Sequence, residues 1–230
     1  MHPWAARVTR DWPPLRTESR AGWRFGSADG ITKRANCALV EDPDADVAEV
    51  TAFYRALGLR PCVQVWPGQE GVDARLAAHG YALVEPTLVL ARDLTERPEG
   101  PGATRIADRP GERWTELFAA TGVDRSWADG VVRILGAVSA AYGVHESGDG
   151  RGCAVVDGDS VALCAMVTAP AARGRGLARH VMDDLLTWAH DRGARHAYLC
   201  VVADNAPALR LYRGAGFTEV SRYHNRMLAD

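Results

Sequence analysis

One stretch of the sequence, residues 161–190, limits the possible folds more than any other. It begins with an apolar run, Val161–Thr168, which ends just before Pro170, a residue that cannot continue a sheet ladder. A basic loop with two glycines, Arg173–Gly176, follows and leads directly into an amphipathic segment, Leu177–His190. The stretch therefore predicts a strand, a glycine turn and a helix in direct succession.

A glycine turn between a strand and a helix N-terminus is suited to bind an anion. Glycines let backbone N–H groups turn toward a ligand, and the unpaired N–H groups and dipole of the helix start favour negative charge. Arg173 and Arg175 add positive charge beside Gly174 and Gly176. We therefore predict a phosphate-binding loop at residues 173–178, with a solvated basic turn as the alternative interpretation.

Two common phosphate-binding loops do not fit these residues. A Walker loop requires a lysine after its last glycine, and the only lysine of the chain, Lys33, is far from any such loop. A dinucleotide-binding fingerprint, G-x-G-x-x-G, fits poorly because Arg179 stands at the place of its third glycine. No acidic residue follows at the distance that this fingerprint requires either.

A third pattern, Arg/Gln-x-x-Gly-x-Gly/Ala, is matched in register by Arg173, Gly176 and Ala178. With this loop the chain resembles the GCN5-related N-acetyltransferases (GNAT), in which the loop holds the pyrophosphate of acetyl-CoA. A second motif, residues 205–217, is similar to the second cofactor-binding segment of the family in its Asn, its Leu-Tyr pair and its Gly-Phe ending. The resemblance covers about residues 101–228.

The resemblance implies an α/β fold with a mixed sheet, the GNAT acyl-CoA N-acyltransferase fold, with a catalytic domain at residues 101–230. A Pro- and Gly-rich segment, residues 95–104, predicts a linker before it. Strands and helices are expected to alternate before this linker as they do after it. Residues 1–98 are therefore predicted to be an accessory half, which is either a degenerate GNAT-like repeat without a cofactor site or an unrelated α+β cap.

Periodicity and turn residues predict the individual elements. Residues 1–20 lack periodicity and are interpreted as an irregular leader. Helices are expected from a cap at Asp44 or Asp46 to Leu57, at 71–79, 112–120, 126–138, 177–193 and after 205, and strands at 23–25, 31–40, 62–66, 81–84, 88–94, 105–107, 141–146, 152–156, 161–168 and 196–202.

The resemblance assigns cofactor-binding roles to residues of both motifs. Backbone N–H groups of the loop would hold the pyrophosphate. The strand before the loop would separate from its neighbour and bind the pantetheine arm, with one backbone N–H polarising the thioester carbonyl. The resulting cofactor-binding residues are Val167, Thr168, Arg173, Gly174, Arg175, Gly176, Leu177, Ala178, Asn205, Leu211 and Tyr212.

The resemblance also implies catalytic roles. Tyr212 would lie near the cofactor sulfur and protonate the departing thiolate, the alternative being a plain core aromatic. Some family members carry a glutamate base on the strand before the loop, but residues 161–168 contain no carboxylate. Glu146 is the best remaining candidate for the base, and deprotonation through water is the alternative. Weaker candidates are three other titratable side chains, His145, Asp124 and His224.

These assignments predict an N-acetyltransferase that transfers the acetyl group of acetyl-CoA to a primary amine by direct attack in a ternary complex. The amine would belong to a small molecule, a protein N-terminus or a lysine, and the acceptor would bind between the two halves. The alternative is a CoA-binding regulatory or structural protein without turnover. A covalent route through Cys164 or Cys200 is conceivable, although buried structural thiols are the favoured interpretation of both.

Composition excludes several other classes. A formal net charge of −2 gives no electrostatic basis for binding nucleic acid or an anionic membrane. Five cysteines, odd in number and without a C-x-x-C, indicate reduced thiols and argue against disulfides or a zinc site. The N-terminus lacks an apolar signal region, and no run approaches a membrane span. We therefore expect a soluble cytoplasmic protein without a metal.

Overall fold

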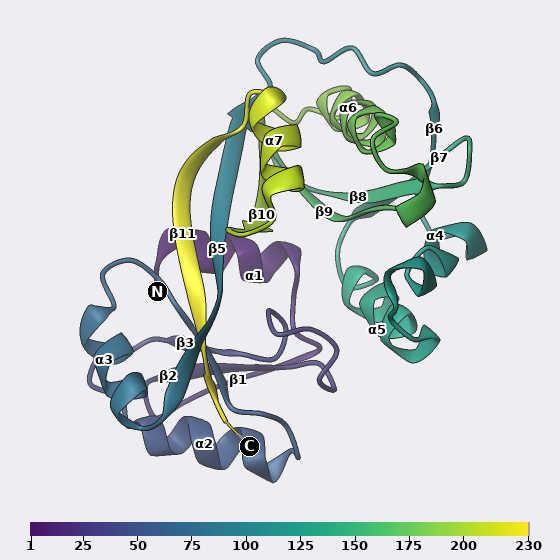
Figure 1. Ribbon diagram of the computed structural model, residues 1–230. Helices are drawn as coiled ribbons and strands as arrows, with labels where there is room; N and C mark the ends of the chain where they lie inside the picture. The colour runs from purple at the N-terminus through teal and green to yellow at the C-terminus, as the bar shows by residue number, and fades with distance from the viewer. Residues whose placement is uncertain (230) are drawn as a thin grey trace. The chain divides into compact units, whose positions relative to one another are not determined.

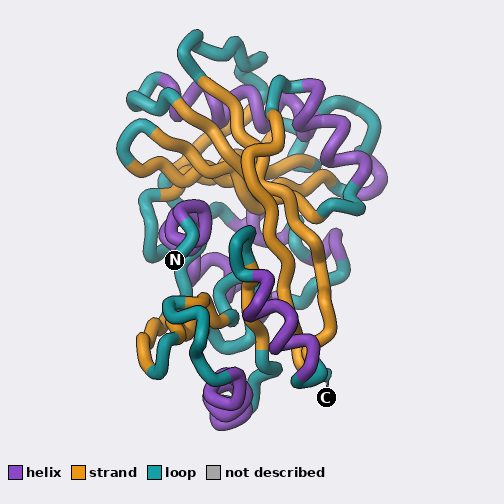
Figure 2. The backbone as a smooth tube through the Cα atoms, turned by 90° about the vertical axis from the view of Figure 1, so that its left-hand side faces the viewer, coloured by secondary structure: helices purple, strands orange, loops and turns teal. Residues whose placement is uncertain are grey.

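The computed structural model describes residues 1–229, without the side chain of Ala120. These residues form two compact units that are interleaved along the chain (Figures 1 and 2). Unit 1 consists of residues 1–89, residues 201–206 and the chain from Glu219 onward, and unit 2 of residues 90–200 and 207–218. The chain passes from one unit to the other several times, whereas the predicted division at residues 98–101 is a single boundary.

Unit 1 contains a sheet with the strand order β1-β2-β3-β4-β11-β5. Strands β3 and β4 are parallel and are connected by α2, whereas the pairs β1–β2, β2–β3 and β4–β11 are antiparallel. The elements of this unit are α1 (Pro3–Asp11), β1 (Arg16–Arg20), β2 (Trp23–Ser27), β3 (Ala38–Val40), α2 (Val47–Ala56), β4 (Cys62–Val65), α3 (Glu70–Ala78), β5 (Tyr81–Asp93) and β11 (Thr218–Leu228).

Aromatic side chains fill the core of unit 1. Trp23, Phe25 and Tyr54 are fully buried, and the Phe25 ring stacks on Phe53 with 4.2 Å between the ring centroids. The Tyr54 hydroxyl donates to the Gly26 carbonyl oxygen at 2.8 Å. Burial of each such side chain stabilises the fold by about 2–3 kcal/mol, and a partnered hydroxyl avoids the penalty of a buried unpaired donor.

Unit 2 contains a sheet with the strand order β5-β10-β9-β8-β7-β6, to which β5 contributes its last residues. Strands β9 and β10 are parallel and are connected by α6, and the pairs from β9 to β6 are antiparallel. The other elements of this unit are β6 (Thr104–Ala107), α4 (Glu112–Glu116), the 3₁₀ helix η1 (Ala119–Thr121), α5 (Arg125–Leu135), β7 (Ala140–His145), β8 (Gly150–Asp157), β9 (Ser160–Thr168), the 3₁₀ helix η2 (Pro170–Ala172), α6 (Leu177–His190), β10 (His196–Val202) and α7 (Ala206–Gly214).

Helices cover both faces of the unit 2 sheet, with α6 on one face and α4 and α5 on the other (Figure 1). Glycines in β7 and β8 let α6 approach closely. A Cβ atom on Gly152 would lie 3.0 Å from Leu185 and 3.1 Å from Val181, so these side chains fill the space that a larger residue would need. On β8, residues that alternate with Gly152 therefore point to the face covered by α4 and α5.

Each unit contains a strand from the other half of the sequence. Strand β11 pairs with β4 of unit 1, with His224 opposite Val65. The end of β5 lies beside β10 of unit 2, and next to it the Leu94 N–H donates to the Arg195 carbonyl oxygen at 2.7 Å. Each unit therefore contains strands from both halves of the sequence.

The same succession of elements occurs twice. Strand, helix, strand, helix and strand follow one another as β3-α2-β4-α3-β5 and again as β9-α6-β10-α7-β11, and in each case the first two strands are parallel. That the N-terminal half is a degenerate repeat, or alternatively an unrelated α+β cap, stays a prediction.

Most predicted elements are confirmed within a few residues, but three predictions are wrong. The predicted leader contains α1, which begins at Pro3, and β1. Only the last three residues of the predicted strand 31–40 are a strand, because Asn36 binds the backbone of Ala28 and Gly30 and holds a turn. The two predicted strands 81–84 and 88–94 form one strand, β5, which continues through Glu85 with a φ of 49°.

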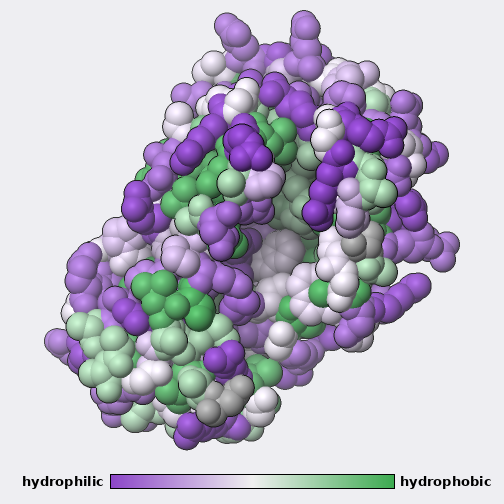
Figure 3. Space-filling view, viewed as in Figure 1, coloured by the Kyte–Doolittle hydropathy of each residue, from purple (hydrophilic) through white to green (hydrophobic). Residues whose placement is uncertain are grey.

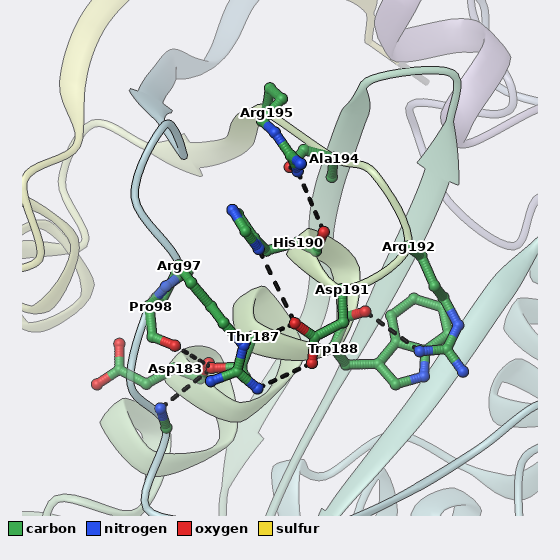
Figure 4. Close-up of polar contacts among 11 residues, drawn as sticks. Arg97, Pro98, Asp183, Thr187, Trp188, His190, Asp191, Arg192, Ala194 and Arg195 are labelled. Atoms are coloured by element: carbon green, nitrogen blue, oxygen red, sulfur yellow. Dashed lines mark hydrogen bonds and ion pairs between the residues drawn. The ribbon is translucent and has the colours of Figure 1, made fainter.

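The predicted linker is a connecting segment that is held on α6 (Figure 4). Arg97 forms a bidentate ion pair with Asp191, with N–O distances of 2.7 and 2.9 Å. The Thr187 hydroxyl donates to the Pro98 carbonyl oxygen at 2.9 Å and accepts the Gly100 N–H at 3.1 Å. These contacts fix the segment on the helix that follows the predicted loop.

Hydrophilic side chains cover much of the face drawn in Figure 3, with small hydrophobic patches between them. Large hydrophobic side chains that are 45–47% exposed are Met1, Leu57, Leu83 and Val220. No helix among residues 1–229 is long and apolar enough to cross a membrane.

Candidate active site

Strand β9, which comes before the predicted loop, is distorted in its second half. Ala165 has a φ of 50°, in the left-handed region that a non-glycine residue rarely adopts. The register between β8 and β9 shifts next to Arg151 of β8, which marks a β-bulge. Beyond the bulge Val167 lies opposite Arg151, and Thr168 lies opposite Gly150. Such bulges bend a strand and are frequent next to active sites.

The parallel strands β9 and β10 are paired only over their first halves. Their ladder runs from the pair Ser160–His196 to the pair Leu163–Leu199. The next residues of β9, Cys164–Thr168, are half-buried. In this described part of the strand, the backbone groups that point away from β8 form no ladder with β10 and can bind a ligand. This agrees with the separation of strands that the family resemblance implies.

The loop between β9 and α6 turns on two glycines in the left-handed conformation. Gly174 has a φ of 77° and Gly176 a φ of 81°, and Gly176 is the N-cap of α6 without a side-chain cap. A Cβ atom on Gly174 would meet no atom within 4 Å, so the space beside the backbone is open. Among the described residues, no acceptor is bonded to the backbone N–H groups of residues 174–178. These free donors at the start of a 14-residue helix fit a phosphate group.

The side chains of the loop also favour a negative charge. Arg173 and Arg175 are exposed, and neither forms an ion pair with an acidic residue of the described chain. Leu177 is 5% exposed and anchors the first turn of α6 in the core, while Ala178 is half-buried. Two unpaired guanidinium groups therefore stand beside the open helix start, where an anion would reduce their mutual repulsion.

A histidine pair that the sequence did not indicate lies beside the loop. The Ser147 backbone N–H donates to His145 Nδ1 at 3.2 Å, so the neutral His145 ring carries its proton on Nε2. That nitrogen lies 3.3 Å from His180 Nδ1, which leaves the proton of His180 on its own Nε2. His180 Nε2 is 3.8 Å from the position that a Cβ atom on Gly176 would take. The pair therefore directs an N–H donor toward the loop.

Tyr212 lies on α7 and is buried, with 7% of its surface exposed. Burial, helped by the neighbouring Cys164 thiol of β9, raises the pKa of Tyr212 to about 12. The phenol therefore keeps its proton at neutral pH. No hydrogen bond to another described residue occupies this hydroxyl. Tyr212 thus supplies a protonated group close to the second half of β9.

The other predicted site residues are less closely connected to the loop. Leu211 is half-buried, and its carbonyl oxygen accepts the Ala215 N–H at 3.1 Å. Asn205 belongs to unit 1, and its cofactor-binding role stays a prediction. Glu146 is exposed in the turn after β7, where only its backbone N–H has a described partner, the Ala103 carbonyl oxygen at 2.8 Å. Its role as a general base likewise stays a prediction.

Within the described residues, no group of three or more His, Cys, Asp and Glu side chains could hold a metal ion. The five cysteines are free thiols, and Cys153 lies directly opposite Cys164 in the β8–β9 pair. Burial raises the pKa of the Cys153 thiol, so this thiol stays protonated at neutral pH.

Comparison with known proteins agrees with this geometry. The family described as "Probable histone acetyltransferase Rv0428c C-terminal" matches residues 5–226. The chain is 26% identical to a curated protein of Bacillus subtilis (strain 168), "Uncharacterized N-acetyltransferase YobR", and the alignment covers 94% of each chain.

Solved structures show the same fold. A GCN5-related N-acetyltransferase from Kribbella flavida has a TM-score of 0.69 at 16% sequence identity, covering 100% of this chain and 97% of that one. A tandem GNAT protein from the clavulanic acid biosynthesis pathway has a TM-score of 0.59 at 14% identity, covering 97% of this chain and 86% of that one. With its mixed sheet and its family match from residue 5 to residue 226, the chain belongs to the Rv0428c C-terminal family of GCN5-related N-acetyltransferases.

Proposed function

We propose that this protein is an N-acetyltransferase that uses acetyl-CoA as the acetyl donor and a primary amine as the acceptor. The observation that carries the proposal is the start of α6, where a helix of 14 residues begins without a side-chain cap at two left-handed glycines. An open helix start with free N–H groups binds phosphate. It follows directly on a strand whose second half is free on one side, so a phosphate site and an extended binding edge are adjacent.

The residues present fit acetyl-CoA. The backbone of residues 174–178 and the side chains of Arg173 and Arg175 would hold the pyrophosphate, since an open cradle lies beside Gly174. The backbone of Val167 and Thr168 would bind the pantetheine arm along the free edge of β9, and Leu211 and Asn205 would complete the cofactor site. Bound acetyl-CoA supplies an acetyl group that is activated as a thioester and a thiolate leaving group.

The residues of the chain would then hold and move protons. Tyr212 carries its proton at neutral pH and would donate it from its hydroxyl to the leaving thiolate. The acceptor amine must lose a proton before it attacks, because a lysine amine, with a pKa of about 10, and an α-amine, with a pKa of about 8, are both mostly protonated at neutral pH. Glu146 would accept that proton, directly or through water. The transfer would occur by direct attack of the amine on the thioester in a ternary complex.

The acceptor is a primary amine of a small molecule, a protein N-terminus or a lysine. The description of the matching family names a histone acetyltransferase, which would place the amine on a lysine side chain. A lysine acceptor of the protein itself is limited to Lys33, which forms an ion pair with Glu85 at 2.7 Å.

The proposal is tested by two measurements on the same protein. The first is the melting temperature with acetyl-CoA, CoA and NAD, where a ligand at one hundred times its Kd stabilises the fold by about 2.7 kcal/mol. We expect a rise with acetyl-CoA and CoA and none with NAD. The second is the release of free CoA thiol with a panel of amines. Release that depends on an added amine supports an acetyltransferase, whereas binding without release leaves a CoA-binding protein without turnover.

A further inference from the structure

Arg151 is the most unusual side chain of unit 2. It lies on β8, none of its surface is exposed, and its three guanidinium nitrogens have no hydrogen-bond partner among the described residues. A buried charge without a partner destabilises a fold by several kcal/mol. Such a side chain is expected where a partner from outside the chain supplies the missing acceptor atoms.

The surroundings of Arg151 are aromatic. Its guanidinium carbon lies 4.2 Å from the centre of the Trp114 ring and 3.5 Å from the centre of the Phe118 ring. These cation–π contacts offset a part of the desolvation of the guanidinium. Neither ring supplies a hydrogen-bond acceptor in place of oxygen, so the guanidinium N–H groups still lack one among the described residues. An anion that meets a planar fork edge-on accepts two parallel hydrogen bonds.

The position of Arg151 connects it with the proposed reaction. Residue 151 alternates with Gly152, whose missing side chain faces α6, and so it points to the opposite face. In the β8–β9 pair it lies opposite Val167, in the segment of β9 with a free edge. The Cys164 thiol lies close enough to both Arg151 and Tyr212 to act on the pKa of each. Arg151 is therefore near the group that would protonate the leaving thiolate.

The charge of Arg151 indicates which anion it would bind. Burial lowers the pKa of Arg151 to about 9, so the side chain remains a cation at neutral pH. The neighbours that act on this pKa are Cys153 and Cys164, both thiols, and no second cation is among them. One guanidinium balances one negative charge, which fits a carboxylate, whereas a phosphate monoester carries close to two.

We propose that Arg151 binds a carboxylate of the acceptor, so that the acceptor is an amine that also carries a carboxylate, as an amino acid or a short peptide does. This inference rests on the proposed function and specifies the acceptor class of the same site. Because Trp114 of α4 and Phe118, the residue before η1, lie against the guanidinium, these two side chains must move for the carboxylate to enter. Arg151 would then be a specificity-determining residue of the transfer.

The first test needs no variant. Amino acids are compared with their carboxamides, which keep the amine and the side chain but lack the negative charge, at saturating acetyl-CoA. We expect the carboxylates to be acetylated with a kcat/KM about 100-fold higher than the carboxamides, as one bidentate charge-assisted pair implies. Equal kcat/KM values for the two series would overturn the inference and leave the proposed function intact.

The second test uses Arg151→Met, which removes the charge and retains much of the volume. We expect the preference for carboxylates to disappear, while the Kd for acetyl-CoA stays unchanged. Without ligand the variant is expected to melt a few degrees higher, because replacing an unpaired buried charge by an apolar side chain is often stabilising. The matched control is Arg105→Met, which changes an exposed arginine on β6 of the same unit and should alter neither property. A preference for carboxylates that survives Arg151→Met would overturn the inference.

A binding measurement separates this inference from the proposed function. The melting temperature of the wild type and of Arg151→Met is measured with amino acids and with their carboxamides in the presence of CoA. A rise with the carboxylates only, and in the wild type only, supports the inference even when no amine is acetylated. If Arg151→Met does not fold, Arg151→Lys keeps the charge without the fork, and it should lower the preference at least tenfold. No rise with any carboxylate overturns the inference.

Discussion

The starts of α2 and α6 show how two similar arrangements differ in chemistry. Each helix follows one strand of its unit and leads to a second strand that is parallel to the first. At the start of α2, the Asp46 carboxylate accepts the Ala48 N–H at 2.9 Å. Asp42 and Asp44 precede this cap, so the α2 start is acidic and satisfies one of its own donors. At the start of α6, Gly176 leaves the donors free.

The difference between the two helix starts affects whether each can hold a phosphate. A carboxylate cap occupies a helix donor and repels anions, whereas glycines with flanking arginines leave the donors open and attract anions. The same succession of strand and helix therefore begins its helix with a side-chain cap in unit 1 and with open donors in unit 2.

The largest effect is expected from a carboxylate placed at the α6 start. Gly176→Glu requires a left-handed backbone that a glutamate rarely adopts, and it puts a negative charge at the phosphate site. We expect the Kd for acetyl-CoA to rise at least 1,000-fold, about 4 kcal/mol, in a titration by calorimetry. Gly193→Glu is the matched control, because Gly193 is left-handed, has no atom near its missing Cβ and lies beyond the other end of α6. Equal affinities for the two variants would remove the phosphate-loop assignment.

The next effect concerns catalysis in unit 2. Tyr212→Phe removes the proposed proton donor without changing the shape of the ring, and we expect kcat to fall about 100-fold with an unchanged Kd for acetyl-CoA. Because the pKa of Tyr212 is raised to about 12, its proton is present throughout the neutral range, and this group should not limit the rate below about pH 11. Tyr81→Phe in unit 1 is the control, since it removes a hydrogen bond to Thr51 and should affect stability only. Full activity of Tyr212→Phe would assign the acid role to water.

A smaller effect is expected on the stability of unit 1. Asp73 binds Arg226 and His224 of β11, and these contacts, Arg226 first, lower the pKa of Asp73 to about 2. The stabilisation is therefore complete above about pH 4 and is lost as the pH falls toward 2, and it amounts to roughly 2 kcal/mol. Asp73→Asn should lower the free energy of unfolding by this amount at pH 7 and reduce its fall between pH 4 and pH 2 by a similar amount. An acid dependence that is as steep in the variant as in the wild type contradicts this account.

The smallest effect is expected at the α2 cap. Asp46→Ala leaves the Ala48 N–H without its acceptor and should destabilise the protein by about 1 kcal/mol in urea unfolding. The affinity for acetyl-CoA should not change, because the α2 start is not a phosphate site. Acetyl-CoA binding that weakens in Asp46→Ala as it does in Gly176→Glu would mean that the two helix starts do not differ in function.

Local sequence chemistry predicted the succession of strand, glycine turn and helix at β9 and α6 better than it predicted the whole sheet. The loop was recognisable because glycines at a strand–helix junction and adjacent arginines have few other uses. The α2 helix was predictable from a cap at Asp44 or Asp46 and an end at Leu57, and in the structure Asp46 is the cap and the helix ends at Ala56. In both cases the residues that determine the structure are close together in the sequence.

Features that depend on distant residues escaped prediction. Strand β11 alternates buried Tyr223, Asn225 and Met227 with charged residues, and its Arg226 is bound by Asp73 on α3 and by the Tyr81 carbonyl oxygen. The approach of His180 to a second histidine depends on α6 packing against β7. The lack of a hydrogen-bond partner for Arg151 depends likewise on which aromatic rings pack against β8. None of these partners can be identified from periodicity along the chain, because each lies on another element.

The position of β11 also determines the order in which the chain can fold while it is being synthesised. The ribosome makes residues 1–89 first, but the β4 edge of unit 1 stays without its neighbour until the chain beyond Glu219 has emerged. Unit 2 ends at Thr218, and its borrowed strand β5 has by then already been made. The part of the protein that is synthesised first is therefore completed last, and until then it exposes an unpaired strand edge to other nascent chains.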